Sequence, residues 1–408
     1  MRLPTSQAGD NTMQKHRLLG FGAATVVILL AALYPYLSTR LRALLLLRAN
    51  SPRKLREFKA FSNYELKFRD ELRNCEDAVI VEEDGMAILS CDPGRDLWNT
   101  VMGTFTKPFS TIPPGELYVY WYDDSTAHQP NTLSRVKLLD FPEVSKFHPL
   151  GIEYHRGSGQ LFVSNHHFDG PRVEIFALET ASQPPIARHI KTIIDPLIRS
   201  PNSIVALNEA EVFLTNDHLF RIKDHRILAN LETYGGLPFG SIVHMHLHSN
   251  SSATLRFVAR LPYANGVTLL NASTLAVAST SSCQVRLYQI RPDRTLELTS
   301  KVDVPFMPDN LATDQRGVLI IAGHPHPPSL ETMVKARQAC LNDSSMIGEC
   351  HVGTAPSWVS EWKPEDGLKT LYTTVGEFGS SSSAARDAGL GLGIITGLYE
   401  KGIMVWRE

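Results

Sequence analysis

Short apolar runs separated by turn-forming residues fill residues 61–408 of the chain. The clearest are ELYVYWYDD, GQLFVSNHH, VEIFALE, CQVRLYQI, GVLIIAGHP and GIMVWRE, and no long amphipathic helix lies between them. Runs of this length and spacing predict β-strands. Because a strand–turn–strand unit recurs many times, the pattern predicts an all-β fold and suits a six-bladed propeller.

An insert over residues 325–355 breaks this pattern. Its segment ETMVKARQACL predicts a short helix at the rim of the propeller, with a solvated loop as the alternative.

The first 60 residues have a different pattern. After a tail over residues 1–17, residues 18–37 read LLGFGAATVVILLAALYPYL without a charge. About 20 apolar residues cross a hydrocarbon core of about 30 Å as a helix. Because the segment lacks a convincing cleavage site, it predicts an uncleaved transmembrane anchor. Residues 38–60, rich in arginine and lysine, predict a basic amphipathic linker.

The orientation of this anchor receives conflicting signals. The basic residues that follow the span favour a cytosolic C-terminal part by the positive-inside rule. Three acceptor sequons, at Asn250, Asn271 and Asn342, favour the opposite side. We expect a single-pass membrane protein whose propeller lies in the lumen of the secretory pathway or outside the cell.

The cysteines support that expectation. Cys75 and Cys91 flank AVIVEEDGMAILS, which predicts two strands joined by a turn and would place the two cysteines nearly opposite each other. Cys340 and Cys350 could close a small loop in the insert, which leaves Cys283 over. Two disulfides would indicate an oxidising compartment, whereas five free thiols would indicate the cytosol.

Composition narrows the class of partner. The 408 residues are 43% hydrophobic and carry a formal net charge of −2. This near-neutral balance gives no electrostatic case for a nucleic-acid partner. It leaves a small-molecule ligand and the membrane as partners, with the oligomeric state open.

Acidic and amide residues lie beside apolar runs at several places. Turn formation is the ordinary explanation for each one taken alone. Together they supply hard oxygen donors from distant strands, which is what calcium requires, and the inner strands of a propeller converge on one axis. These places are Glu76-Asp77, Asn202, Asn216-Asp217, Asn265 and Asp309-Asn310.

The alternating histidines of VHMHLH are a competing metal site. His244, His246 and His248 would share one face of a strand, a spacing that zinc sites use. No carboxylate or cysteine is aligned with them, so we favour polar alternation on an outer strand.

The segments CEDAVIVEEDGMAILS, PNSIVAL, TNDHLF, YANGV, PDN and GHP, in this order and spacing, resemble the serum paraoxonase/arylesterase family. TNDH followed by YANG is the most specific part. The resemblance covers roughly residues 70 to 408 and suggests a divergent or fungal-like member of this family of six-bladed propellers. It implies a calcium ion that acts as cofactor and Lewis acid in the hydrolysis of lactones and aryl esters. The positions that match the family's calcium ligands are Glu76, Asn202, Asn216, Asp309 and Asn310.

The sequence departs from the family at the histidine pair that activates water. Leu150 stands where the family has the first histidine, and His166 matches the second. His148, two residues before Leu150, would face the same side of an extended segment and could substitute. His324, which also matches the family, could orient substrate or act as the base.

A second departure concerns a structural calcium in the family. The matching positions are Asp77, the carbonyl of Ile152, and Ser203 where the family has aspartate. A hydroxyl replaces a carboxylate there, so we expect that site to be weak or empty. The family also has a disulfide between its first and last strands, and no cysteine lies near GIMVWRE, so closure must rely on strand pairing.

These observations predict a calcium-dependent hydrolase of carboxylic esters or lactones. Because Leu150 breaks the histidine pair, the alternative is a non-catalytic, calcium-stabilised binding module. A third possibility is a lyase or synthase resembling strictosidine-synthase-type propellers, which need no calcium. Glu76 with Asp309-Asn310 argues against that third possibility.

Overall fold

The structure is a computed structural model that describes residues 31–123, 131–249, 252–342 and 353–408. The described residues up to position 45 and those from position 46 onward form two compact units, and residues 31–49 are helical. Within the described ranges, no helix is both long enough and apolar enough to cross a membrane. Residues 18–30 of the predicted anchor lie outside those ranges, so the anchor stays a prediction.

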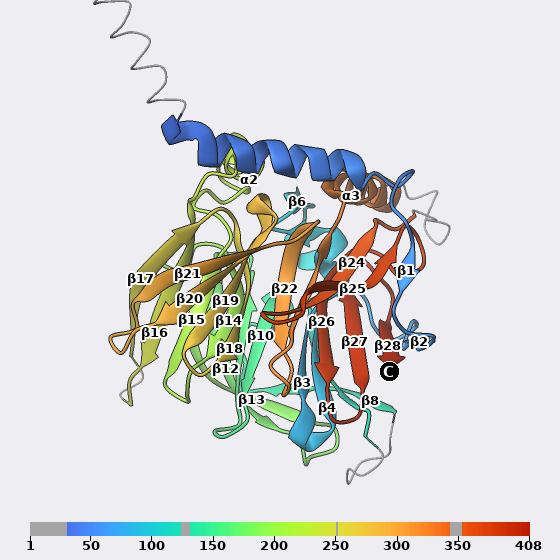
Figure 1. Ribbon diagram of the computed structural model, residues 1–408. Coiled ribbons are helices and arrows are strands. Elements are labelled where there is room, and N and C mark those ends of the chain that lie inside the picture. The colour runs from blue at the N-terminus through green and yellow to red at the C-terminus, as the bar shows by residue number, and fades with distance from the viewer. Residues whose placement is uncertain (1–30, 124–130, 250–251, 343–352) are drawn as a thin grey trace, which may run out of the picture. The chain divides into compact units, whose positions relative to one another are not determined.

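Six antiparallel sheets make up the second unit (Figure 1). From inner to outer strand they are β3 (Cys75–Val81), β4 (Met86–Cys91), β7 (Glu116–Trp121) and β8 (Thr132–Arg135); β10 (Pro149–His155), β11 (Gln160–Asn165), β12 (Arg172–Glu179) and β13 (Ile186–Ile193); β14 (Pro201–Ala206), β15 (Glu211–Asn216), β16 (Gly240–Leu247) and β17 (Ala253–Leu261); β18 (Ala264–Asn271), β19 (Thr274–Ser279), β20 (Gln284–Ile290) and β21 (Leu296–Asp303); β22 (Met307–Thr313), β23 (Leu319–His324), β24 (Ser357–Lys363) and β25 (Gly367–Thr374); and β26 (Ser381–Asp387), β27 (Leu392–Gly397), β28 (Ile403–Arg407) and β2 (Asn63–Lys67). Each innermost strand contacts the innermost strands of both neighbouring sheets, which closes a ring. The predicted six-bladed propeller is confirmed.

Shorter elements complete the second unit. They are β1 (Phe58–Lys59), which pairs with β25; β9 (Lys137–Leu139), which pairs with β13; the ribbon of β5 (Trp98–Asn99) and β6 (Thr104–Phe105); and the 3-10 turns η1 (Glu82–Asp84), η2 (Pro93–Asp96), η3 (Phe109–Thr111), η4 (Val144–Lys146) and η5 (Thr280–Ser282).

The strand β23 shows why continuous apolar runs form strands here. Leu319, Ile320, Ile321 and Ala322 are all buried. Leu319 and Ile321 pack against β19 and β20, whereas Ile320 and Ala322 pack against β27 and β28. Successive side chains of a strand point to opposite faces, and a propeller covers both faces of each inner sheet region with neighbouring blades. The run is therefore apolar without alternation.

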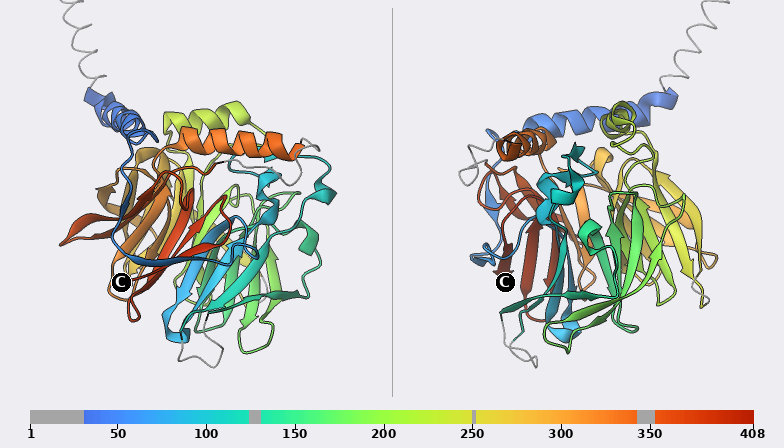
Figure 2. Two further views of the ribbon diagram at one scale, coloured as in Figure 1. Left: turned by 90° about the vertical axis from the view of Figure 1, so that its right-hand side faces the viewer. Right: turned by 180° about the vertical axis from the view of Figure 1, so that it is seen from behind.

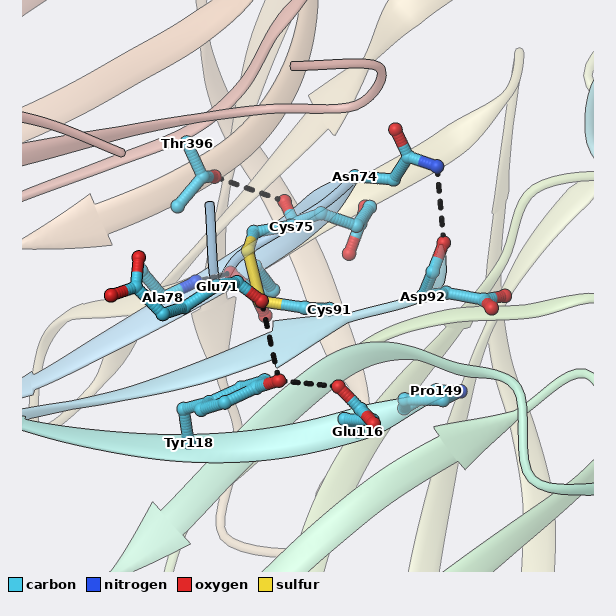
Figure 3. The surroundings of a disulfide bond; sticks show 12 residues. Glu71, Asn74, Cys75, Ala78, Cys91, Asp92, Glu116, Tyr118, Pro149 and Thr396 are labelled. Atoms are coloured by element: carbon cyan, nitrogen blue, oxygen red, sulfur yellow. Dashed lines mark hydrogen bonds between the residues drawn. A yellow bond between two sulfur atoms is a disulfide. The ribbon is translucent and has the colours of Figure 1, made fainter. Parts of the chain in front are cut away.

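Strand pairing closes the ring. β2, from the N-terminal side, pairs antiparallel with β28 at the C-terminus, from Asn63 opposite Arg407 to Lys67 opposite Ile403. This confirms the prediction of closure by strand pairing. The predicted Cys75–Cys91 disulfide is also confirmed and joins β3 to β4 (Figure 3). Cys350 lies outside the described residues, so its pairing with Cys340 stays a prediction.

Two helices lie at the same end of the propeller, as Figures 1 and 2 show. α3 (Pro327–Asn342) is the helix predicted in the insert. α2 (Arg226–Gly235) was not predicted, because its ten residues are too few to give a clear periodic signal.

Of the three predicted glycosylation sites, the structure describes the side chain of one, Asn271. Asn271 is exposed at the turn between β18 and β19. Asn250 and the side chain of Asn342 lie outside the described part of the chain.

Candidate active site

Each of the six inner strands has a β-bulge or similar register shift near its first residues. The regular pairing of each inner strand with its neighbour skips one or two residues near its start. The skipped residues are Glu76, Leu150-Gly151, Asn202-Ser203, Asn265-Gly266, Asp309-Asn310 and Ser382. Such bulges leave residues unpaired and redirect their side chains. The ring of bulges therefore presents polar side chains of distant sequence to one another.

Two glycines allow the neighbouring bulges to approach closely. A Cβ atom on Gly266 would lie 2.5 Å from the Cα of Asn310 and 2.6 Å from the carbonyl oxygen of Asp309. A Cβ atom on Gly151 would lie 2.2 Å from the carbonyl oxygen of Asn202. Only glycine fits such distances between backbones, so these positions hold the inner strands together around the axis.

A cavity of about 520 Å³ lies against this ring, and residues of α2 and α3 also line it. Buried oxygens of the ring and its surroundings have no hydrogen-bond partner in the described protein. They are Glu76 Oε2, Asn202 Oδ1, Asp217 Oδ2, Asn265 Oδ1 and Asn310 Oδ1. A buried acceptor without a partner costs about 1–3 kcal/mol, so several of them together indicate a shared partner.

Calcium fits this set of atoms. All are carboxylate or amide oxygens, the ligand types that calcium prefers. Glu76 Oε1 accepts a hydrogen bond from Asn310 Nδ2 at 3.0 Å, which holds these two residues side by side. Burial, with the adjacent charges of Asp77 and Asp309, raises the pKa of Glu76 well above its usual range. A divalent cation between Glu76 and Asp309 would remove that electrostatic cost.

Asn265, rather than Asn216, belongs to this set. The Asn216 Oδ1 atom accepts hydrogen bonds from the backbone N–H groups of Arg199 and Ser200, and its Nδ2 donates to Leu197 and Ser241. Asn216 therefore has no free oxygen, and it ends β15, the second strand of its blade, instead of occupying an inner bulge.

The sequence contained a signal for this difference. Asn265 stands at the start of an inner strand, in the same place as Asn202 and Asp309, whereas Asn216 ends its strand. Since Asn265 and Asn216 are the same residue type, only their position within the blade indicates which of them has an oxygen free to bind a metal ion. Asp217, which lines the cavity, was noted in the sequence only as a neighbour of Asn216.

The residues of the predicted second calcium site bond to one another instead. Asp77 accepts hydrogen bonds from the Ile152 N–H at 2.9 Å, the Ala78 N–H at 2.9 Å and the Ser383 hydroxyl at 3.0 Å. Ser203 Oγ accepts from the Val267 N–H at 3.3 Å. Protein donors occupy both Asp77 oxygens, so the geometry favours a structural link between β3, β10 and β26.

His324 has the orientation of a general base. Its Nε2 lies 2.9 Å from Asp309 Oδ2. A carboxylate oxygen only accepts, so Nε2 carries the proton and Nδ1 keeps its lone pair. Nδ1 has no partner in the described protein, and His324 lines the cavity.

His166 also lines the cavity, but both of its ring nitrogens are occupied. Nε2 lies 2.6 Å from the carbonyl oxygen of Pro201, and Nδ1 bonds to the Thr100 hydroxyl. The carbonyl requires a proton on Nε2, so Nδ1 accepts from Thr100. Burial lowers the pKa of His166 and keeps it neutral. Leu150 lines the same cavity.

The structure places His148 outside the cavity lining. Its ring is only 1% exposed, packs between Trp98 and Phe168, and its Nδ1 lies 3.1 Å from Asp92 Oδ2. Leu150 faces the cavity and His148 does not, because a bulge interrupts the strand alternation between them.

His244 and His246 of β16 and the following His248 do not belong to any cluster with metal-ligand spacing among the described residues, although the rings of His246 and His248 are in contact. His244 Nε2 lies 3.2 Å from Glu211 Oε1, and Arg294 binds both oxygens of Glu211. His248 Nε2 bonds to Thr254.

The one cluster with metal-ligand spacing among the described residues contains Glu143, His167 and Asp169. Lys146 lies 3.1 Å from Glu143 and 2.8 Å from Asp169, and Arg172 also binds Glu143. These two cations already balance both carboxylates, so the cluster is a surface ion-pair network.

Comparisons with known proteins identify several that are similar to this chain. Serum paraoxonase/arylesterase 2 of Canis lupus familiaris is 28% identical over 193 residues, which are 46% of this chain and 52% of that relative. Serum paraoxonase/arylesterase 1 of Homo sapiens is 26% identical over 255 residues, 56% of this chain and 69% of that relative. The chain thus spans about half the length of the first of these relatives.

A solved structure described as a putative gluconolactonase covers 87% of this chain and 95% of its own, with a TM-score of 0.47 and 14% identity. A family model described as Arylesterase matches residues 104–341, more than half of the sequence. The chain belongs to the arylesterase family.

Proposed function

We propose that this protein is a calcium-dependent hydrolase of carboxylic esters or lactones. One observation carries the proposal: Glu76, Asn202 and Asn265 each have a buried oxygen without a partner in the described protein, and all three line one cavity. The proposed ligands are Glu76, Asn202, Asn265, Asp309 and Asn310. Their two carboxylates balance a divalent cation formally, and their three amides add dipoles without neutralising it further. The chemistry supplied by a bound calcium is Lewis-acid polarisation of the ester carbonyl.

His324 is the proposed general base. Asp309 orients its ring through Nε2, so Nδ1 can accept a proton from the attacking water. In many hydrolases a carboxylate orients the catalytic histidine by accepting a hydrogen bond from one ring nitrogen, which leaves the other nitrogen free to accept a proton. Asp309 and His324 have this arrangement. His166 is a positioning residue, because its link to Pro201 and Thr100 holds the cavity wall in place.

A non-catalytic calcium-stabilised binding module is the second candidate. Two observations favour it specifically. Leu150 cannot accept a proton, and both nitrogens of His166 already have protein partners. On this alternative, the ring would bind calcium for stability and the cavity would only bind a ligand.

A hydrolysis panel on the full-length protein separates the two candidates. Phenyl acetate and γ-butyrolactones would be tested with calcium and with a chelator, on wild type, His324→Ala and His324→Gln. We expect calcium-dependent turnover that falls by about 10²- to 10⁴-fold in both variants. His248→Ala is the matched control, because His248 directly follows β16, bonds to Thr254 through Nε2 and is not among the residues that line the cavity.

Calorimetry distinguishes loss of the base from loss of the metal. Calcium affinity should change far less than turnover in His324→Ala. Full turnover in His324→Ala would remove the base assignment. If calcium-loaded wild type binds the metal and hydrolyses no ester or lactone, the binding module is the better description.

We further propose that the propeller lies in the secretory pathway or outside the cell. The Cys75–Cys91 disulfide supports an oxidising compartment. Asn271 is exposed, and its Oδ1 lies 3.2 Å from the hydroxyl of Ser273, the third residue of its sequon. Glycosidase treatment should increase gel mobility, and Asn271→Gln should remove part of that change. Unchanged mobility together with alkylation of all five cysteines would contradict this location.

A further inference from the structure

Arg95 is a buried arginine in the cavity wall, and no carboxylate of the described residues pairs with it. It belongs to the turn η2, directly after β4, and is 3% exposed. Its Nη2 donates to the Pro149 carbonyl at 3.3 Å, and its Nε has no partner in the part of the chain that the structure describes. No carboxylate of the described residues lies within ion-pair distance of it, although Arg95 lines the cavity beside Glu76 and His166.

The acidic neighbours of Arg95 in sequence are already engaged. Asp92 accepts from the Gly94 N–H and pairs with His148. Asp96 binds Arg337 through both of its oxygens, at 2.6 and 2.9 Å. Local sequence thus provides two carboxylates, and the fold directs both away from the Arg95 guanidinium.

A second buried arginine shows how this protein neutralises such a charge where no ligand is involved. Arg386 has a side chain that is 5% exposed, and it contacts three carboxylates. Asp314 Oδ2 lies 2.7 Å from its Nη2, and Glu361 and Glu408 lie 2.9 and 2.7 Å from its Nη1. A guanidinium stays charged in proteins, and a buried charge without a partner is costly. Arg386 is thus paired with three carboxylates, whereas Arg95 pairs with none of the described ones, and this difference in charge balance needs an explanation.

Glu76 does not provide it. Glu76 lines the same cavity, but among the described residues it forms no ion pair with Arg95, and its Oε1 accepts from Asn310 instead. In the proposed site, the charges of Glu76 and Asp309 are balanced by calcium. The positive charge of Arg95 then stays unbalanced and faces the cavity.

We propose that Arg95 binds a carboxylate group of the substrate, so that the preferred substrates are esters or lactones that carry a free carboxylate. This inference rests on the proposed hydrolase function and adds a substrate class to it. The guanidinium presents parallel N–H donors that match a carboxylate, and such charge-assisted hydrogen bonds are stronger than neutral ones. Leu150 and Trp98, which line the same cavity, would contact the apolar part of the molecule.

Matched compounds test this inference. The first pair is a γ-butyrolactone with a ring carboxylate and its neutral carboxamide. The second pair replaces the ring oxygen by methylene, giving cyclopentanone analogues that bind without being hydrolysed. Calorimetry with the calcium-loaded full-length protein should show tighter binding of the carboxylate than of the carboxamide analogue, by about 10- to 100-fold.

The variants give the expected and the contradicting results. In Arg95→Met the ratio of the two dissociation constants should fall close to one, and in Arg95→Lys to an intermediate value, because lysine keeps the charge and loses the planar fork. Arg199→Met is the matched control, since Arg199 is an exposed arginine at the same cavity and should leave the ratio unchanged. An unchanged ratio in Arg95→Met would overturn the inference and indicate that the carboxylate binds calcium instead. If Arg95→Met does not fold, an unchanged ratio in Arg95→Lys overturns it equally.

The same compounds separate this inference from the proposed function. Arg95-dependent binding of the analogues without hydrolysis of either lactone would keep the carboxylate site and reject the hydrolase. Hydrolysis of both lactones at equal efficiency, with equal binding of the two analogues, would keep the hydrolase and reject the carboxylate site.

Discussion

Glu76 and Asp77 are adjacent acidic residues at one bulge of β3, yet their carboxylates have opposite surroundings. Asp77 accepts three hydrogen bonds from two backbone N–H groups and one hydroxyl. Glu76 accepts one, from Asn310, and its other oxygen has no partner in the described protein. Both are buried. The number of protein donors, rather than burial or charge, therefore decides which carboxylate is available to a metal ion.

The same contrast separates other residues of identical type. Asn265 has a free Oδ1 where Asn216 has none, and Arg95 lacks the carboxylates that surround Arg386. In each pair one member is satisfied by the fold, and the other presents its polar atoms to the cavity. Unsatisfied buried groups are costly, so they tend to mark functional sites.

The largest expected effect is on calcium binding in Asp309→Asn. Removing one of two charges that face a divalent cation should leave a net loss of about 2–3 kcal/mol, which weakens calcium binding roughly 30- to 150-fold. Calorimetric titration of the full-length protein measures this. Calcium affinity equal to wild type would reduce Asp309 to a turn residue and remove the main support for the enzyme.

Asp77→Asn should affect stability instead. An amide cannot accept from all three present donors, so the loss should be about 1–3 kcal/mol in the free energy of unfolding in urea. Calcium affinity should stay within a few-fold of wild type, because both Asp77 oxygens are already used. A loss of calcium affinity as large as in Asp309→Asn would show that Asp77 and Asp309 bind the same ion. It would contradict the conclusion that protein donors make Asp77 unavailable to calcium.

Ser203→Asp tests whether an added carboxylate near Asp77 creates a second calcium site. Wild type should bind one calcium tightly, because the residues around Asp77 are satisfied by each other. A carboxylate at position 203 adds the charge that this second position lacks, so calorimetry should then show an additional, weaker binding event. Two tight sites in wild type would mean that backbone carbonyls compensate for the serine.

Glu211, which does not line the cavity, is another carboxylate whose properties are set by its protein donors. Its substitution should have the smallest effect of these variants, and that effect is on stability at low pH. The bidentate hydrogen bond from Arg294 lowers the pKa of Glu211 to about 2. A depressed folded-state pKa contributes stability that is present above the unfolded value of about 4.3 and is lost as the pH falls toward 2. We expect this contribution to be about 1–2 kcal/mol after allowance for solvent screening. Glu211→Gln should remove that part of the acid dependence in urea unfolding at several pH values, and an unchanged pH profile would contradict it.

Much of this molecule follows from local patterns in its chain. Apolar runs with regular turns predict strands wherever neighbouring sheets cover both faces, and the run around Ile320 is an example. The Cys75–Cys91 bridge follows from a hairpin whose length places the two cysteines opposite each other. Glu76, Asn202, Asp309 and Asn310 follow from a resemblance that rests on short contiguous motifs. Such features depend on neighbours within a few residues, and the sequence alone displays them.

The availability of each polar group depends on partners that are distant in sequence. Asp77 is satisfied by Ile152 and Ser383, which lie 75 and 306 residues away along the chain. From the sequence, His148 could have replaced the missing histidine at Leu150, but the bulge in β10 turns it toward Asp92 instead. Hydrogen bonds and ion pairs act over about 3 Å in space, irrespective of separation along the chain. Which asparagine keeps a free oxygen, and which arginine keeps an unbalanced charge, is therefore decided only when six blades bring their inner strands together.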